Sequence, residues 1–119
     1  MKSIARILAS VSLAIGLGSA PALAAFDPGG LSSQEARTLM DDLIHAGIAG
    51  MNCPGLTYPE TANDLLNAAV DQLAAKLGIS TDALDDKHYK KAFDAYDQDT
   101  AGYCAKWGPR IGGLLDKID

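Results

Sequence analysis

The chain has 119 residues, 48% of them hydrophobic, with 10 Lys and Arg against 15 Asp and Glu for a formal net charge of −5 at pH 7. This length and apolar content predict one small domain with a buried core. The acidic balance argues against nucleic-acid binding through a basic patch and against docking on an anionic membrane surface.

Residues 1–24 have the organisation of a cleavable signal peptide. Lys2 and Arg6 give a positive start, the stretch that follows is apolar, and Ala22-Leu23-Ala24 places small residues at the two positions that a signal peptidase reads. The apolar stretch is shorter than the roughly 20 residues that a membrane span needs. We therefore predict cleavage after Ala24, no membrane span, and export to a periplasm or out of the cell.

Residues 25–119 are predicted to form a single helical domain. Without Lys2 and Arg6, eight Lys and Arg face fifteen Asp and Glu, so its net charge is −7. Cys53 and Cys104 are the only cysteines, and an even count in an exported domain predicts a disulfide. Closing a loop of about 50 residues constrains the unfolded chain by roughly 4 kcal/mol. The sequence has no C-x-x-C motif, so neither a redox-active dithiol nor a C-x-x-C-H haem attachment is expected.

The first predicted helix spans Ser33 to Gly50. Ser32 and Glu35 have the spacing of a capping box, in which each side chain bonds the backbone N–H of the other residue. Apolar residues then recur at helical spacing, at Leu39, Met40, Leu43, Ile44, Ile48 and Met51. The run Asn52-Cys53-Pro54-Gly55 is predicted to end this helix.

The second predicted helix spans Tyr58 to Leu77. Thr57 is the expected N-cap with Glu60 at N3, and Pro59 is tolerated in the first turn because its missing N–H has no intrahelical partner there. One face is apolar, with Leu65, Leu66, Ala69, Val70, Leu73 and Leu77. Gly78 is expected to end the helix in the left-handed conformation.

A short helical turn from Ser80 to Leu84 comes next, followed by a third long helix that Asp85 or Asp86 is expected to cap. Its aromatic residues follow helical spacing, at Tyr89, Phe93, Tyr96, Tyr103 and Trp107, with Thr100 at the one step that lacks a ring. This spacing predicts a single seam facing the core. Gly108-Pro109 breaks the helix, and Ile111 to Ile118 forms a short terminal helix.

No segment alternates with the period of a β-strand. We therefore predict an all-α fold, a small bundle of about four helices, one of them short. The disulfide is expected to join the end of the first helix to the end of the third.

Asp97, Asp99 and Gly102 match positions one, three and six of an EF-hand calcium loop. Ala101 stands at position five, and Gly108 stands at position twelve, where a bidentate glutamate is needed. Because half of the loop is missing, no metal site is predicted. Asp97 and Asp99 are the candidate ligands, and a solvated acidic turn is the alternative.

Tyr58, Tyr89 and Trp107 are the candidates for an apolar groove that would hold a small ligand, with packing in the core as the alternative. The two histidines, His45 and His88, have neither zinc-site spacing nor a nucleophile motif beside them. We therefore predict no catalytic residues, no enzymatic activity and no cofactor.

The function predicted is that of a small exported protein that binds another protein, as a stress chaperone, an inhibitor or an immunity protein. In overall organisation the chain is similar to the periplasmic acid-stress chaperones, which are short helical domains with one disulfide spanning about 50 residues. It departs from them because Cys53 follows a helix instead of opening one. The alternative is a protein that binds a small ligand or a metal ion, through the aromatic groove or the acidic 97–102 turn. The sequence leaves the oligomeric state open.

Overall fold

The computed structural model describes residues 26–119, so the predicted signal peptide, residues 1–24, lies outside the described residues. The described part is built of helices, without a strand: η2 (Pro28–Gly30), α2 (Ser33–Asn52), α3 (Glu60–Leu77), α4 (Thr81–Ala83), η3 (Leu84–Tyr89), α5 (Lys90–Gln98), α6 (Thr100–Trp107), η4 (Gly108–Arg110) and α7 (Ile111–Ile118). The predicted all-α fold is thus confirmed.

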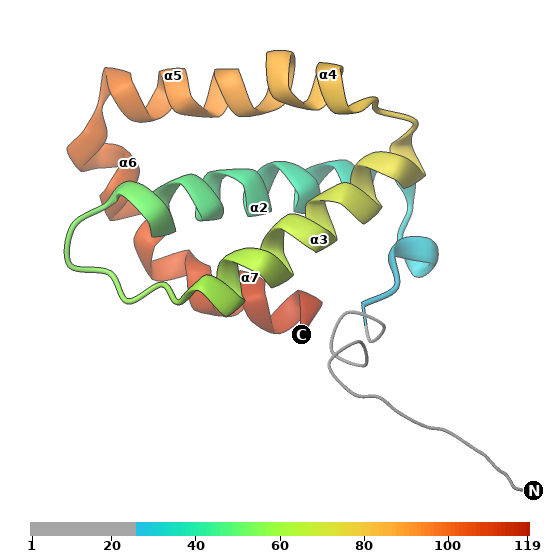
Figure 1. The fold of residues 1–119 in the computed structure, drawn as a ribbon, viewed down its shortest axis with the longest axis horizontal. Coiled ribbons are helices and arrows are strands. Elements are labelled where there is room, and N and C mark those ends of the chain that lie inside the picture. The colour runs from blue at the N-terminus through green and yellow to red at the C-terminus, as the bar shows by residue number, and fades with distance from the viewer. Residues whose placement is uncertain (1–25) are drawn as a thin grey trace, which may run out of the picture.

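The central helix is α2, which contacts α3, α5, α6 and α7. Figure 1 shows α3 and α7 on one side of α2, and α4 with α5 running along the other side. At the end of α5 the chain turns down through α6, which lies near the C-terminal end of α2. The helices therefore form a bundle around one long helix.

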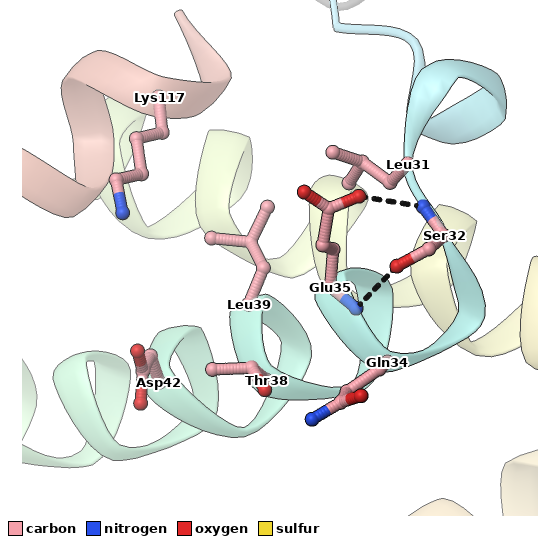
Figure 2. Close-up of a pocket in the computed structure, with 8 residues that line it drawn as sticks. All are labelled: Leu31, Ser32, Gln34, Glu35, Thr38, Leu39, Asp42 and Lys117. Atoms are coloured by element: carbon pink, nitrogen blue, oxygen red, sulfur yellow. Dashed lines mark hydrogen bonds between the residues drawn. The ribbon is translucent and has the colours of Figure 1, made fainter.

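The start of α2 is as predicted. The Ser32 hydroxyl accepts the backbone N–H of Glu35 at 3.1 Å, and the Glu35 carboxylate accepts the N–H of Ser32 at 2.8 Å (Figure 2). The bond from the Ser32 N–H lowers the pKa of Glu35, because it stabilises the ionised carboxylate, and the Ser32 hydroxyl beside the carboxylate acts in the same direction. The helix runs two residues beyond the predicted end, to Asn52, whose side chain donates to the Ile48 carbonyl oxygen at 2.8 Å.

The predicted start of the second helix is wrong. α3 begins at Glu60, and its N-cap is Pro59, so Thr57 caps nothing and Glu60 stands at the first helical position. The residue before a proline is disfavoured in the helical conformation, which keeps Tyr58 outside the helix. The predicted end is confirmed, because Gly78 is left-handed with φ 72° and the Ile79 N–H bonds back to Ala74.

The third predicted helix differs from the structure at its start and in its middle, while its predicted end before Gly108-Pro109 is confirmed. No break occurs at Asp85 or Asp86, since α4 continues through the π-helical η3 into α5. The chain then breaks at Asp99, which has extended φ −152° and caps α6. The local Asp99 bond to the Gly102 N–H, at 3.0 Å, ends one helix and starts the next.

The aromatic seam is correspondingly shorter than predicted. Tyr103 and Trp107 are buried, whereas Phe93 is 43% exposed. Ala92 takes the core-facing position beside it. A small side chain at that position lets α5 approach α2 closely.

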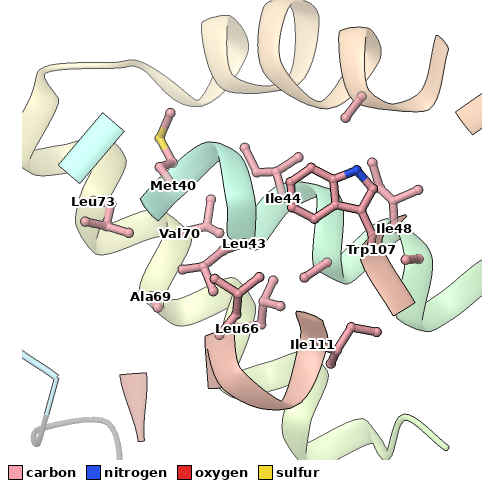
Figure 3. Close-up of a cluster of buried hydrophobic side chains, with 14 of the residues drawn as sticks. Met40, Leu43, Ile44, Ile48, Leu66, Ala69, Val70, Leu73, Trp107 and Ile111 are labelled. Carbon is pink, nitrogen blue, oxygen red and sulfur yellow. The ribbon is translucent and has the colours of Figure 1, made fainter. Parts of the chain in front are cut away.

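The core gathers on α2 and α3 and is completed by the C-terminal part of the chain. Figure 3 shows side chains from α2 and α3 together with Trp107 and Ile111. The largest fully buried side chains are Met40, Leu43, Ile44, Leu66, Val70, Leu73 and Ile118. Burying each of these contributes about 1.5 to 3 kcal/mol.

The predicted disulfide is confirmed. Cys53, the C-cap residue of α2, is bonded to Cys104 of α6 with an S–S distance of 2.03 Å and a sequence separation of 51 residues. Because the structure interrupts the predicted third helix, the bond holds the separate α6 against the end of α2. Among residues 26–119, no helix has the length and apolar character that a membrane crossing requires.

Replacing Gly50 with alanine is expected to destabilise the protein by about 1 to 3 kcal/mol, because the added Cβ would lie only 2.6 Å from the Tyr58 ring. Gly112 is the matched control, since a Cβ there meets nothing within 4 Å. Its replacement with alanine should be neutral or gain up to about 1 kcal/mol from helix propensity. Urea denaturation measures both. Equal effects of the two substitutions would show that Tyr58 does not pack on Gly50.

Candidate functional site

The most densely connected group of polar and aromatic side chains lies where α2, α5 and α6 meet. We call it the aromatic cluster, and it consists of His45, Tyr96, Tyr103 and Trp107. His45 comes from α2, Tyr96 from α5, and Tyr103 and Trp107 from successive turns of α6. The disulfide at Cys104 fixes α6 beside α2 and so brings these rings together.

The His45 ring is the centre of the cluster. It stacks on Trp107 with 4.6 Å between ring centroids and 11° between planes. Its Nδ1 lies 2.8 Å from the Tyr103 hydroxyl, which donates to the His45 backbone carbonyl oxygen at 3.2 Å. Since the hydroxyl proton is used at the carbonyl, Nδ1 is the donor in the shorter bond. The neutral imidazole therefore carries its proton on Nδ1 and leaves Nε2 as an acceptor.

Tyr96 extends the cluster to α5. Its ring meets the Tyr103 ring edge-on, with 5.6 Å between centroids and 90° between planes. Its hydroxyl donates to the Asn52 carbonyl oxygen at 3.4 Å. The end of α5 is thus tied to both α6 and the end of α2.

Positive side chains surround Trp107. The Arg110 guanidinium carbon is 4.4 Å from the indole centroid, and the Lys106 Nζ is 5.3 Å from it. Both distances fall within the range of a cation–π contact. Arg110 also forms an ion pair with Asp42 of α2 at 3.1 Å. η4 is therefore held to α2 through both the indole and a carboxylate.

The surroundings of His45 disfavour its charged form. Burial lowers the pKa of its imidazole, Lys106 and Arg110 lower it further, and Asp41 and Asp42 act in the opposite direction. Burial raises the pKa of the Tyr103 phenol well above its ordinary value. Both side chains are therefore neutral at pH 7.

A cleft of about 320 Å³ opens beside the cluster, lined by His45, Ala95, Asp99, Gly102, Tyr103, Lys106 and Trp107. It offers aromatic surface, one ammonium group and one carboxylate. A second cleft lies between the first turns of α2 and the end of α7 (Figure 2), where Leu31 and Leu39 supply apolar surface and Lys117 a positive charge.

The three residues of the predicted groove do not all line the cleft beside the aromatic cluster. Trp107 lines the cleft beside the cluster, whereas Tyr58 and Tyr89 are not among its lining residues. Tyr58 packs on Gly50, and its hydroxyl donates to the Asn63 side chain at 3.2 Å. Burial raises the pKa of both tyrosines to about 12, and Tyr89 adds to the shift of Tyr58. Tyr58 and Tyr89 therefore lie away from the cleft that Trp107 lines.

The acidic turn has a structural role in the described chain. The Asp99 carboxylate accepts the Gly102 N–H and caps α6, while Asp97 is exposed near the end of α5. Within residues 26–119, no three His, Cys, Asp or Glu side chains are grouped so that they could hold a metal ion. The second histidine, His88, lies 3.4 Å from Asp41 and links η3 to α2.

Three large apolar side chains are exposed in the described part of the chain. Met51 is 67% exposed, Phe93 43% and Leu56 37%. Met51 and Leu56 flank Cys53 in the sequence. Phe93 lies one turn before Tyr96, whose hydroxyl donates to the Asn52 carbonyl oxygen. We call these three residues the apolar end.

Sequence reasoning singled out Trp107 and Tyr103 through their helical spacing. It missed the pairing of His45 with Tyr103, because 58 residues separate them and the break at Asp99 decides where α6 lies. The local signals are Asp41 and Asp42, which place carboxylates four and three residues before the ring, on the same face of the helix.

Comparisons of the chain with protein-family models, with curated proteins and with solved structures found no match.

Replacing Tyr103 with phenylalanine should cost at least about 1 kcal/mol of unfolding free energy, because it removes the hydroxyl that accepts from the His45 Nδ1–H and donates to the His45 carbonyl oxygen. The matched control is Tyr96→Phe, which removes a longer and more exposed bond and should cost less. Urea denaturation at pH 7 measures both. A Tyr96 variant that is destabilised more than the Tyr103 variant would contradict the assigned hydrogen bonds.

Proposed function

We propose that this is an exported protein, periplasmic or secreted, that acts by binding another protein and has no catalytic activity of its own. The observation that carries this proposal is the apolar end. Met51 and Leu56 lie on either side of the disulfide-bonded Cys53 in the sequence, and large exposed apolar side chains of this kind on a small acidic domain are typical of an interaction surface. Stress chaperone, inhibitor and immunity protein are the types of binding protein that fit this size and organisation.

The position of the apolar end supports the proposal. Met51 occupies the last turn of α2, two residues before the disulfide-bonded Cys53, and Leu56 lies in the loop that follows. The disulfide holds the backbone of this region in place. A surface that is already ordered binds with a smaller loss of conformational entropy than a mobile loop does.

The net negative charge of the chain favours a partner whose surface is basic or neutral. The chain carries an excess of acidic residues, and an anionic protein associates faster with a surface of opposite charge. The apolar end would supply the buried contact, while the acidic surface would steer the encounter.

The alternative function is binding of a small ligand, and the cleft beside the aromatic cluster is the observation that favours it. His45, Lys106 and Asp99 place an imidazole, a cation and an anion around aromatic walls. Binding there would change the fluorescence of Trp107, the only tryptophan in the chain. A partner protein bound at the apolar end would instead shield the exposed Met51 side chain from solvent.

Met51→Asp should abolish partner binding, because it places a charge in the apolar end. The wild-type protein, Met51→Asp and Asn67→Asp are used for affinity capture from an exported fraction, followed by mass spectrometry. Asn67 is exposed on α3, so its substitution adds the same charge elsewhere. We expect one partner that wild type and Asn67→Asp retain and Met51→Asp loses.

Two outcomes would contradict the proposal. One is that no protein is captured above the level of a blank resin, and the other is that all three variants capture the same proteins. Suppression of the thermal aggregation of a reporter enzyme, measured at neutral and acidic pH, then separates a chaperone from an inhibitor or immunity protein. Only a chaperone protects an unrelated client.

A further inference from the structure

We propose that Met51 is a site of reversible oxidation, at which a peroxide converts the thioether to a sulfoxide and so makes the most exposed side chain of the apolar end polar. The modification itself depends only on the exposure of this sulfur. Its consequence for partner binding rests on the function proposed above.

The two methionines of α2 differ in exposure. Met51, in the last turn, is 67% exposed, whereas Met40 is 0% exposed in the core. The third methionine of the chain, Met1, belongs to the predicted signal peptide. An oxidant must reach a sulfur to oxidise it. Met51 is therefore the methionine of α2 that a peroxide attacks in the folded protein.

The cysteine sulfurs do not compete for the oxidant as thiols. The chain has two cysteines, and both are used in the bond between Cys53 and Cys104. A free thiolate is the form of cysteine that reacts with peroxide, and the disulfide removes it. Met51 is thus the most exposed sulfur-containing side chain among residues 26–119.

The reaction is a two-electron oxygen transfer. The Met51 sulfur attacks one oxygen of hydrogen peroxide, so that an S–O bond forms as the O–O bond breaks. The other oxygen takes the proton of the transferred hydroxyl and leaves as water. The sulfur is oxidised and the peroxide is reduced. A methionine sulfoxide reductase reverses the change with two electrons from a dithiol, and the oxygen again leaves as water.

The sulfoxide changes the surface and leaves the fold intact. Met51 is the most exposed of the three side chains of the apolar end, so its packing contributes little to the core. α2 closes beyond it, where the Cys53 N–H bonds to the Ala49 carbonyl oxygen at 2.8 Å, and the disulfide holds the same cysteine. A polar S=O group opposes burial against an apolar partner surface, because it would lose its hydrogen bonds to water there.

Peptide mapping tests the site. The protein is treated with dilute hydrogen peroxide at neutral pH, and mass spectrometry follows the sulfoxide content of each methionine peptide. Because a buried side chain reacts only when the core opens, we expect Met51 to react at least about tenfold faster than Met40. In concentrated urea, which unfolds the chain, the two rates should become equal.

Retention on a phenyl column and urea denaturation test the consequence for the surface. The oxidised protein should elute earlier than the untreated protein, with the same free energy of unfolding, and methionine sulfoxide reductases should restore its retention. Two variants assign the effect to one side chain. Met51→Gln, which is polar and of similar length, should elute early without treatment. Met51→Leu, which is apolar and has no sulfur, should keep its retention after treatment.

Partner capture tests the consequence for binding. Burial of one methionine side chain is lost, so the oxidised protein should bind its partner roughly ten- to hundredfold more weakly than the untreated protein does. Peroxide treatment should leave the binding of Met51→Leu unchanged.

Equal oxidation rates of Met51 and Met40 in the folded protein would overturn the proposal. So would retention that is unchanged when Met51 is fully oxidised, an equal loss of retention in Met51→Leu, or a partner that binds the oxidised protein as tightly as the untreated one. If the untreated protein captures no partner, the function proposed above fails, and peptide mapping and retention still decide whether Met51 is the oxidation site.

Discussion

The covalent bond between Cys53 and Cys104 determines how the second half of the chain meets the first. It joins the residue that ends α2 to the middle of α6, across a break at Asp99 that would otherwise leave α6 free to swing about the end of α5. With α6 held there, Tyr103 and Trp107 reach His45, and η4 reaches Asp42. Met51 and Leu56 of the apolar end lie within three residues of the same bond. Both candidate sites thus depend on one crosslink.

Features fixed by neighbouring residues could be predicted from the sequence. The capping box of Ser32 and Glu35 and the left-handed Gly78 are local, so they determine the start of α2 and the end of α3 without reference to the rest of the fold. The disulfide was predictable because only one pairing of two cysteines exists. The apolar periodicity of α2 and α3 likewise identifies the faces that form the core.

Features that depend on distant contacts could not be predicted in the same way. Tyr58 precedes a proline and packs on Gly50 of another helix, which moves the start of α3 to Glu60. The π-helical turn of η3 and the cap at Asp99 change which residues of α5 and α6 face α2, and so leave Phe93 exposed. In the sequence His45 shows only its acidic neighbours Asp41 and Asp42, because Tyr103 and Trp107 come from a helix placed by the disulfide.

The most direct test of this account is urea denaturation of the double variant Cys53→Ser, Cys104→Ser, combined with near-ultraviolet circular dichroism of Trp107. The account predicts a loss of about 4 kcal/mol in the free energy of unfolding, as expected for releasing a loop of this length. It also predicts that the near-ultraviolet signal of the tryptophan weakens, because α6 is no longer held against α2. A variant with unchanged stability and an unchanged tryptophan signal would show that noncovalent packing alone positions α6, and the account would then be wrong.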